Sequence, residues 1–164
     1  MVKRVSKDRT TLNESKVPLD LTIDTALLMV AFVVLMLIAT VSPSLFERSY
    51  MMAIEIALSI PFLASSAFVR VKMMGMPESA VLDRFSYVTF IIGYALIINT
   101  IGIMLSITVS SFVSILFLAM NVAIALAYST ALVTDHMEMA KQRFGRDLLF
   151  TIIIVVLGIL MVIR

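Results

Sequence analysis

Cysteine and tryptophan are both absent from this 164-residue chain. Without cysteine there is no disulfide, no thiolate metal ligand and no cysteine nucleophile, so the sequence carries no sign of a redox compartment. The single histidine, His136, is one ligand, where structural zinc sites use about four and catalytic sites about three. The sequence therefore predicts no metal, no cofactor and no catalytic residues, and it favours a protein that is not an enzyme.

Charge is missing from a long internal stretch. Between Arg84 and Asp135 every residue is uncharged, and most are Ile, Leu, Val, Ala, Met or Phe. A helix rises about 1.5 Å per residue and crosses the ~30 Å hydrocarbon layer of a bilayer in roughly 20 residues. The stretch therefore predicts two membrane spans and the turn between them. The composition agrees, because the hydrophobic share of 61% exceeds the roughly 45 to 50% of soluble globular proteins.

Other apolar runs extend this prediction to an all-α integral membrane protein with five transmembrane helices. The predicted spans cover residues 24–43, 50–69, 86–107, 112–134 and 148–163, within a domain of residues 22–164 that follows a polar cytoplasmic segment of residues 1–21. Pro43 ends the first span, because proline lacks the amide proton that continues a helix. Residues 108–111 are polar and uncharged, so we expect a tight turn there and an antiparallel hairpin of the third and fourth spans.

Basic residues predict the orientation of these spans. All but two of the 13 Lys and Arg residues fall on one side of the predicted membrane, namely Lys3, Arg4, Lys7, Arg9, Lys16, Arg70, Lys72, Arg84, Lys141, Arg143 and Arg146. Only Arg48 and Arg164 fall on the other side. Cytoplasmic loops carry the excess of Lys and Arg. We therefore expect a multi-pass protein of the cell membrane with a cytoplasmic N-terminus and an external C-terminus.

Polar and small side chains recur at helical spacing on the three middle spans. The second span carries Glu55, Ser59, Ser66 and Arg70 along one face, and the third carries Ala95, Asn99, Gly102 and Ser106. The fourth carries Ser114, Asn121, Tyr128 and Asp135 at every seventh position, and Ala119, Ala123, Ala127 and Ala131 at every fourth. Small residues let helix backbones approach closely in lipid, and Ser or Asn side chains hydrogen-bond across helices. We expect the three stripes to face one another or a second copy of the chain.

Glu55 is the only acidic or basic residue in the interior of a predicted span. A charged side chain at the bilayer centre costs roughly 2.5 to 3.5 kcal/mol on insertion scales, so an intramembrane acid is a candidate functional residue. Glu55 lies near the external end of its span, at a depth similar to those of Asn99 and Asn121. Two interpretations stay open for each of these residues: packing through hydrogen bonds between helices, or the lining of a wet path.

The polar stripes favour a homo-oligomeric channel or pore for small cations. Its path would be lined by Glu55, Ser59, Asn99, Asn121 and Tyr128, and Glu47 would form an acidic external mouth, because rings of carboxylates concentrate cations. An alternative is a structural or accessory subunit whose stripes pack against a partner membrane protein. A second alternative is an interfacial lipid-handling enzyme with its polar groups on the cytoplasmic side, at Asp83, Asp135, His136, Glu138 and Asp147.

In all three hypotheses the main partner is the lipid bilayer. The basic residues of the N-terminal segment alternate with acidic ones, which is unlike a nucleic-acid-binding patch. We therefore expect no nucleic acid as a partner.

Overall fold

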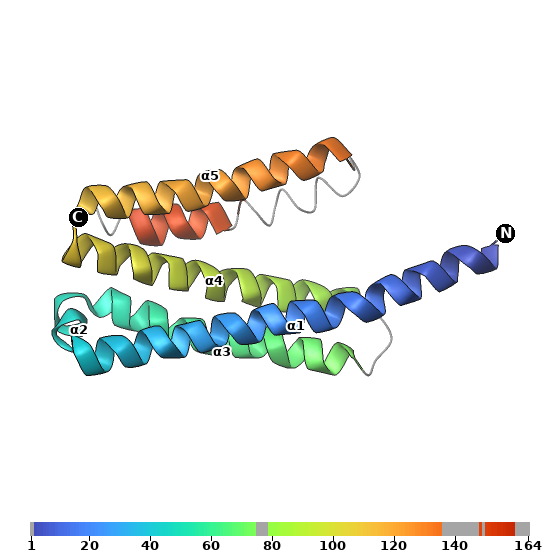
Figure 1. The fold of residues 1–164 in the computed structure, drawn as a ribbon, viewed down its shortest axis with the longest axis horizontal. Helices are drawn as coiled ribbons and strands as arrows, with labels where there is room; N and C mark the ends of the chain where they lie inside the picture. The colour runs from blue at the N-terminus through green and yellow to red at the C-terminus, as the bar shows by residue number, and fades with distance from the viewer. Residues whose placement is uncertain (1, 75–78, 136–147, 149, 160–164) are drawn as a thin grey trace.

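The computed structural model describes residues 2–74, 79–135, 148 and 150–159, and every regular element in these ranges is a helix (Figure 1). The helices are α1 (Val2–Val41), α2 (Ser44–Arg48), α3 (Tyr50–Met73), α4 (Ala80–Thr108), α5 (Ser111–Asp135) and the π-helix η1 (Ile154–Ile159). No strand occurs in the described part of the chain. The all-α prediction is confirmed for these residues.

Three of the helices are long and apolar enough to cross a membrane. They cover Pro18–Val41 within α1, Tyr50–Met73 and Ala80–Thr108, and a shorter apolar helical segment covers Ser111–Ala127. These helices mark the chain as a membrane protein. The fourth and fifth spans remain predictions, as does the orientation of the termini.

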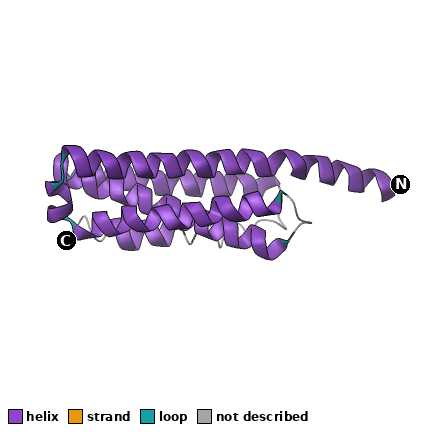
Figure 2. Ribbon diagram, turned by 90° about the horizontal axis from the view of Figure 1, so that it is seen from below, coloured by secondary structure: helices purple, strands orange, loops and turns teal. Residues whose placement is uncertain are grey.

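The helix α1 begins well before the start of the span predicted at residue 24. It is continuous from Val2, passes through Pro18, and its N-terminal part projects beyond the other helices (Figure 2). The apolar part of α1 likewise begins at Pro18 rather than at Asp24. The helix therefore continues through Asp24, and the side chain of Asp24 is buried against α3.

The helix α4 lies at the centre of the bundle. It packs against α3 and α1 on one side and against α5 and η1 on the other (Figure 1). Successive long helices run antiparallel, and the turn between α4 and α5 is closed by a hydrogen bond from Ser110 N to Leu105 O. The predicted antiparallel hairpin around residues 108–111 is confirmed for the helices α4 and α5. This order of helices decides which polar stripe meets which neighbour.

Three hydrophobic clusters of described residues hold the bundle together. The first cluster joins α4 to α5 and to the last helix, which covers residues 150–159 and includes η1. Its buried members are Ile91, Ala95, Ile98, Leu118, Phe150 and Ile154. The other two join α1, α3 and α4 and contain Ala31, Ile56, Leu63 and Ile97 in one case, and Ile38, Leu45, Met52 and Ile103 in the other. Small residues allow the close approach of α3 and α4: a Cβ on Gly93 would lie 2.8 Å from Leu63 Cγ.

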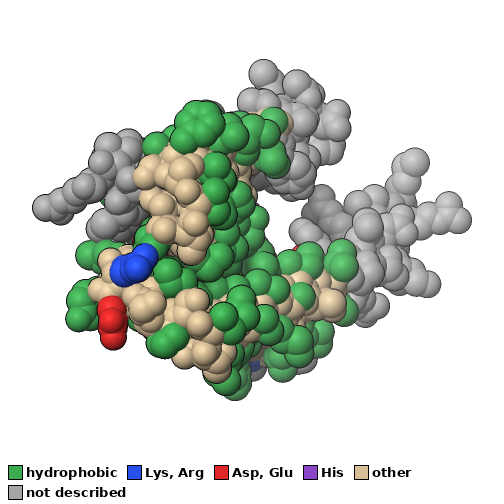
Figure 3. All heavy atoms as spheres, turned by 60° about the vertical axis from the view of Figure 1, so that its left-hand side comes forward, with side chains coloured by type: hydrophobic (Ala, Val, Ile, Leu, Met, Phe, Trp, Pro, Cys, Tyr) green, Lys and Arg blue, Asp and Glu red, His purple; other side chains and the backbone are tan. Residues whose placement is uncertain are grey.

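The outer surface of the bundle is apolar. Large hydrophobic side chains are exposed along α1, α3 and α5, among them Phe32, Val33, Phe68, Phe112 and Ile124. Hydrophobic side chains likewise cover most of the described surface in Figure 3, where charged ones are sparse. Such a surface suits lipid as the surrounding solvent.

Candidate functional site

Glu55 lies on the inward face of α3 and is 5% exposed. Met52, one turn earlier, packs against α1 and α4, and so does Ile56, the next residue. The carboxyl group therefore sits in the seam between α1, α3 and α4. Its Oε2 atom accepts no hydrogen bond from any described residue. A buried polar group without a partner costs roughly 1 to 3 kcal/mol, so this atom has an unused capacity to bind a proton or a small cation.

Ser59 follows Glu55 by one turn on the same buried face. Its hydroxyl donates to Ile56 O at 2.8 Å and is thus used within its own helix. Ser66 and Arg70 continue the face toward the C-terminal end of α3, and both are buried. The predicted stripe of the second span is therefore the interior face of α3, turned toward α1 and α4 of the same chain.

Asn99 lies on the opposite side of α4 from this seam. Its amide donates a long hydrogen bond of 3.4 Å to Ile153 O, and its fully buried Oδ1 atom has no partner among the described residues. The backbone of η1 passes close by, since a Cβ on Gly158 would lie 2.6 Å from Asn99 Oδ1. Asn99 thus connects α4 to the last helix, whereas Glu55 faces α1 and α4.

The rest of the α4 stripe also faces away from α3. Ser114 of α5 donates to Gly102 O at 2.7 Å, and the hydroxyl groups of Ser106 and Ser111 lie 3.3 Å apart. Within one chain, the stripes of α3 and α4 therefore do not share a common centre. The spacing of these residues predicted which of them share a face of α4, but it could not show which neighbouring helix that face meets.

No described contact brings Asn121, Tyr128 or Glu47 to the seam between α1, α3 and α4 that contains Glu55. The Asn121 amide donates to Phe117 O of its own helix at 2.9 Å, and the side chain is half-buried. Glu47 is exposed on the short helix α2. The side chain of Tyr128 lies outside the described residues. The cation-path role of these three residues stays a prediction.

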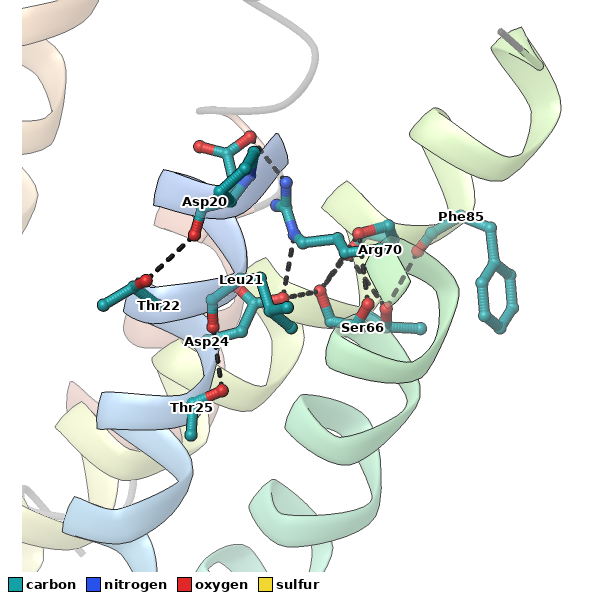
Figure 4. A network of polar contacts seen from close by, with 11 residues as sticks. Asp20, Leu21, Thr22, Asp24, Thr25, Ser66, Arg70 and Phe85 are labelled. Carbon is teal, nitrogen blue, oxygen red and sulfur yellow. Dashed lines mark hydrogen bonds and ion pairs between the residues drawn. The ribbon is translucent and has the colours of Figure 1, made fainter. Parts of the chain in front are cut away.

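A second polar cluster lies at the other end of α3 and joins three helices (Figure 4). Arg70 donates from Nε to Asp24 Oδ2 at 2.8 Å and from Nη1 to Asp20 Oδ2 at 2.6 Å. Ser66 donates to Asp24 Oδ2 at 2.6 Å, and the Ser86 hydroxyl of α4 lies 3.1 Å from that of Ser66. We call Asp20, Asp24, Ser66, Arg70 and Ser86 the ionic cluster.

The ionic cluster was not predicted from the sequence. Asp24 was treated as a boundary of the first span, and Arg70 was placed in the polar stripe of the second span and among the charges that set orientation, without a partner for either residue. A signal was present: Asp20 and Asp24 are one turn apart on the first helix, and Ser66 and Arg70 are one turn apart on the second. Antiparallel neighbours would bring the two pairs to the same membrane boundary, where opposite charges attract.

Most of the residues proposed for a lipid-handling enzyme lie outside the described part of the chain. Asp83 is exposed in the first turn of α4, while His136, Glu138 and Asp147 lie outside the described residues and the side chain of Asp135 is likewise not described. Within the ranges that the structure covers, no group of His, Asp and Glu is arranged to hold a metal ion.

No protein-family model matches the chain, and no curated protein or solved structure matches it either. The buried polar groups of the bundle are thus the basis on which its function can be inferred.

Proposed function

We propose that this membrane protein conducts protons or other small monovalent cations, and that Glu55 is the acid that the permeating ion meets. The observation that carries this proposal is the buried carboxyl group of Glu55, whose Oε2 atom has no partner among the described residues. An ionised acid in this position is energetically costly, which makes it a candidate functional residue. Nearby carboxylates favour cations over anions.

The proposed path follows the seam between α1, α3 and α4. Glu55, Ser59, Ser66 and Arg70 all lie on the buried face of α3 that borders this seam. Fifteen residues separate the first from the last, which corresponds to about 22 Å of helix in a hydrocarbon layer of ~30 Å. Polar groups are therefore spread along most of the thickness of the membrane.

This geometry favours a path within each chain over a path at the centre of an oligomer. The polar stripe of α3 packs against α1 and α4 of its own chain, and the stripe of α4 packs against α5 and the last helix. Association of several copies remains part of the proposal, with the outer faces of the bundles in contact. The five-span topology of the proposal rests on the apolar runs of the sequence, and its orientation in the cell membrane rests on the distribution of basic residues.

Flux measurements in liposomes test this proposal. Purified protein should pass protons, Na⁺ or K⁺, and Glu55→Gln should reduce the flux at least about tenfold, which corresponds to roughly 1.4 kcal/mol of barrier. Gln preserves the shape of the side chain and removes its charge. The matched control is Asp83→Asn, which neutralises an exposed carboxylate in the first turn of α4 and should retain most of the flux. Wild-type protein that passes none of these ions would overturn the proposal.

An accessory subunit is the second candidate, and the outer face of α5 favours it. Ala119 and Ala123 are exposed one turn apart on this helix, and Asn121 lies half-buried between them in sequence. Small residues at this spacing allow a helix of another chain to approach closely. Purification in mild detergent distinguishes the two functions. A stoichiometric partner whose binding is lost in Ala123→Leu supports the accessory role, and a protein isolated only with itself argues against it.

A further inference from the structure

The ionic cluster has an imbalance of charge. Asp20 and Asp24 of α1 both bind the single guanidinium group of Arg70, through Nη1 and Nε respectively. With both carboxyl groups ionised, the three side chains carry one uncompensated negative charge. Asp20 is partly exposed, with 32% of its side-chain surface accessible, whereas only 1% of the Asp24 side chain is accessible. Water can therefore screen Asp20 but not Asp24.

The two oxygen atoms of Asp24 are used unequally. Oδ2 accepts from Ser66 Oγ at 2.6 Å and from Arg70 Nε at 2.8 Å. Oδ1 is buried and has no partner among the described residues. A free, buried carboxylate oxygen beside an excess negative charge is a binding point for a cation. The guanidinium group 2.8 Å from Oδ2 would repel a metal ion, so the smallest cation, a proton bonded to Oδ1, fits this point best.

We propose that Asp24 takes up one proton at Oδ1 and that this protonation operates a latch between α1 and α3. A hydronium ion next to the ionic cluster transfers its proton to a lone pair of Asp24 Oδ1. An O–H bond forms, and the hydronium ion becomes a water molecule. The charge of the cluster changes from minus one to zero, while Arg70 stays protonated. Oδ2 remains an acceptor for the Ser66 hydroxyl, but the charge that held Arg70 to Asp24 is gone, and the guanidinium group stays on Asp20.

Among the described residues, no other buried charge lies beside Asp24 that could replace this proton. On α1 the neighbouring charged group is Asp20, on α3 it is Arg70, and α4 contributes the neutral Ser86 hydroxyl. The remaining charged side chains near this end of the described bundle are exposed to solvent, namely Lys72, Asp83 and Arg84. The balance between Asp20, Asp24 and Arg70 therefore governs the latch.

The position of the cluster explains why its charge matters for the fold. Most of the contacts that α1 makes with the long helices are to α3, and few are to α4. The ion pairs of Arg70 are the charged part of the α1–α3 contact, at the end of the bundle opposite α2. Protonation of Asp24 weakens this end alone, because the clusters around Ala31 and Ile38 do not depend on charge. The expected motion is a local separation of α1 from α3 near Arg70.

Infrared difference spectroscopy tests the proton site. Acidification of wild-type protein in bilayers should produce the high-frequency C=O band of a poorly hydrated carboxylic acid. This band should shift when the protein is labelled with ¹³C at the aspartate side-chain carboxyl, a test that needs no mutation. It should disappear in Asp24→Asn and persist in Asp20→Asn. A band whose frequency does not shift with the aspartate label, or a band that is still present in Asp24→Asn, would overturn the proposal.

Paired spin labels test the latch. The chain has no native cysteine, so Leu19→Cys on α1 and Val71→Cys on α3, both at exposed positions, place the only two labels. Acidification should lengthen or broaden the distance distribution between them. In the Asp24→Asn background the low-pH distribution should be present already at neutral pH. Identical distributions at both pH values in the otherwise wild-type protein would overturn the latch. Neither the infrared band nor the spin-label distance depends on ion flux. The latch and the proposed conduction through Glu55 are therefore tested independently.

Discussion

Arg70 Nε lies 2.8 Å from Asp24 Oδ2, and this contact ties the end of α3 to the middle of α1 across 46 residues of sequence. Both side chains are buried. A buried ion pair adds little net stability when it is intact, but removal of one partner leaves the other charge uncompensated in a poorly solvated site.

We expect Arg70→Met to destabilise the bundle by roughly 3 to 5 kcal/mol, the cost of breaking a buried pair by removing one member. Unfolding in mixed micelles, followed by helical circular dichroism, measures the effect. Lys72→Met is the matched control, because Lys72 is exposed on the same helix, and surface substitutions usually stay within about 0.5 kcal/mol. The double variant Asp24→Asn with Arg70→Met should recover part of the loss. A loss for Arg70→Met no larger than that for Lys72→Met would contradict the burial of this pair.

Gly93 should not tolerate a side chain. A Cβ at this position would lie 2.8 Å from Leu63 Cγ and 3.2 Å from Leu63 N, and the backbone atom cannot move aside as a side chain can. We expect Gly93→Ala to cost about 1 to 3 kcal/mol, the usual range for overpacking. The comparison is Gly102→Ala, where the three nearest atoms all belong to the Leu118 side chain and none belongs to a backbone. Equal stability of Gly93→Ala and the wild type would show that α3 and α4 are farther apart than described.

Gly158 and Asn99 should be coupled energetically. A Cβ on Gly158 would lie 2.6 Å from Asn99 Oδ1, so Gly158→Ala pushes against the amide of Asn99. We expect Gly158→Ala to be destabilising in the wild type and much less so in an Asn99→Ala background. A double-mutant cycle measures the coupling, which for residues in contact is about 0.5 to 3 kcal/mol. Strictly additive effects of the two substitutions would place η1 away from Asn99.

The Ser114 hydroxyl should contribute modestly to the hairpin of α4 and α5. It donates to Gly102 O at 2.7 Å and is fully buried. Interhelical hydrogen bonds in a membrane protein average about 0.6 kcal/mol in double-mutant cycles, so Ser114→Ala should cost about this much. Ser44→Ala, at an exposed position of the short helix α2, is a suitable comparison in the same unfolding assay. A loss of several kcal/mol in Ser114→Ala would mean that this hydroxyl has a larger role.

Much of the helical architecture could be predicted from the sequence. Apolar runs separated by polar residues indicated α3, α4 and the hairpin to α5, because the length and charge limits of a bilayer are strict. The first helix extends further toward the N-terminus than the span predicted from residue 24. Asp24 was treated as a boundary, although a charge can lie within an apolar helix once a partner such as Arg70 is in contact with it.

The relative rotation of the helices could not be predicted from the sequence. The periodic spacing of Glu55 and Ser59, or of Asn99 and Gly102, shows only that each pair shares a face of one helix. Which neighbour each face meets depends on the order in which the helices pack, and the central position of α4 separates the two faces. The contacts of Arg70 with Asp20 and Asp24 were missed because they join segments far apart in the sequence.

The most direct test of conduction through Glu55 is the ion flux measured as its carboxyl group is progressively modified. A lipid-soluble carbodiimide reacts with protonated carboxyl groups inside membranes, and mass spectrometry of the peptide that contains Glu55 gives the modified fraction. Cation flux into liposomes should fall in proportion to this fraction. Full flux through protein whose Glu55 is completely modified would contradict the account.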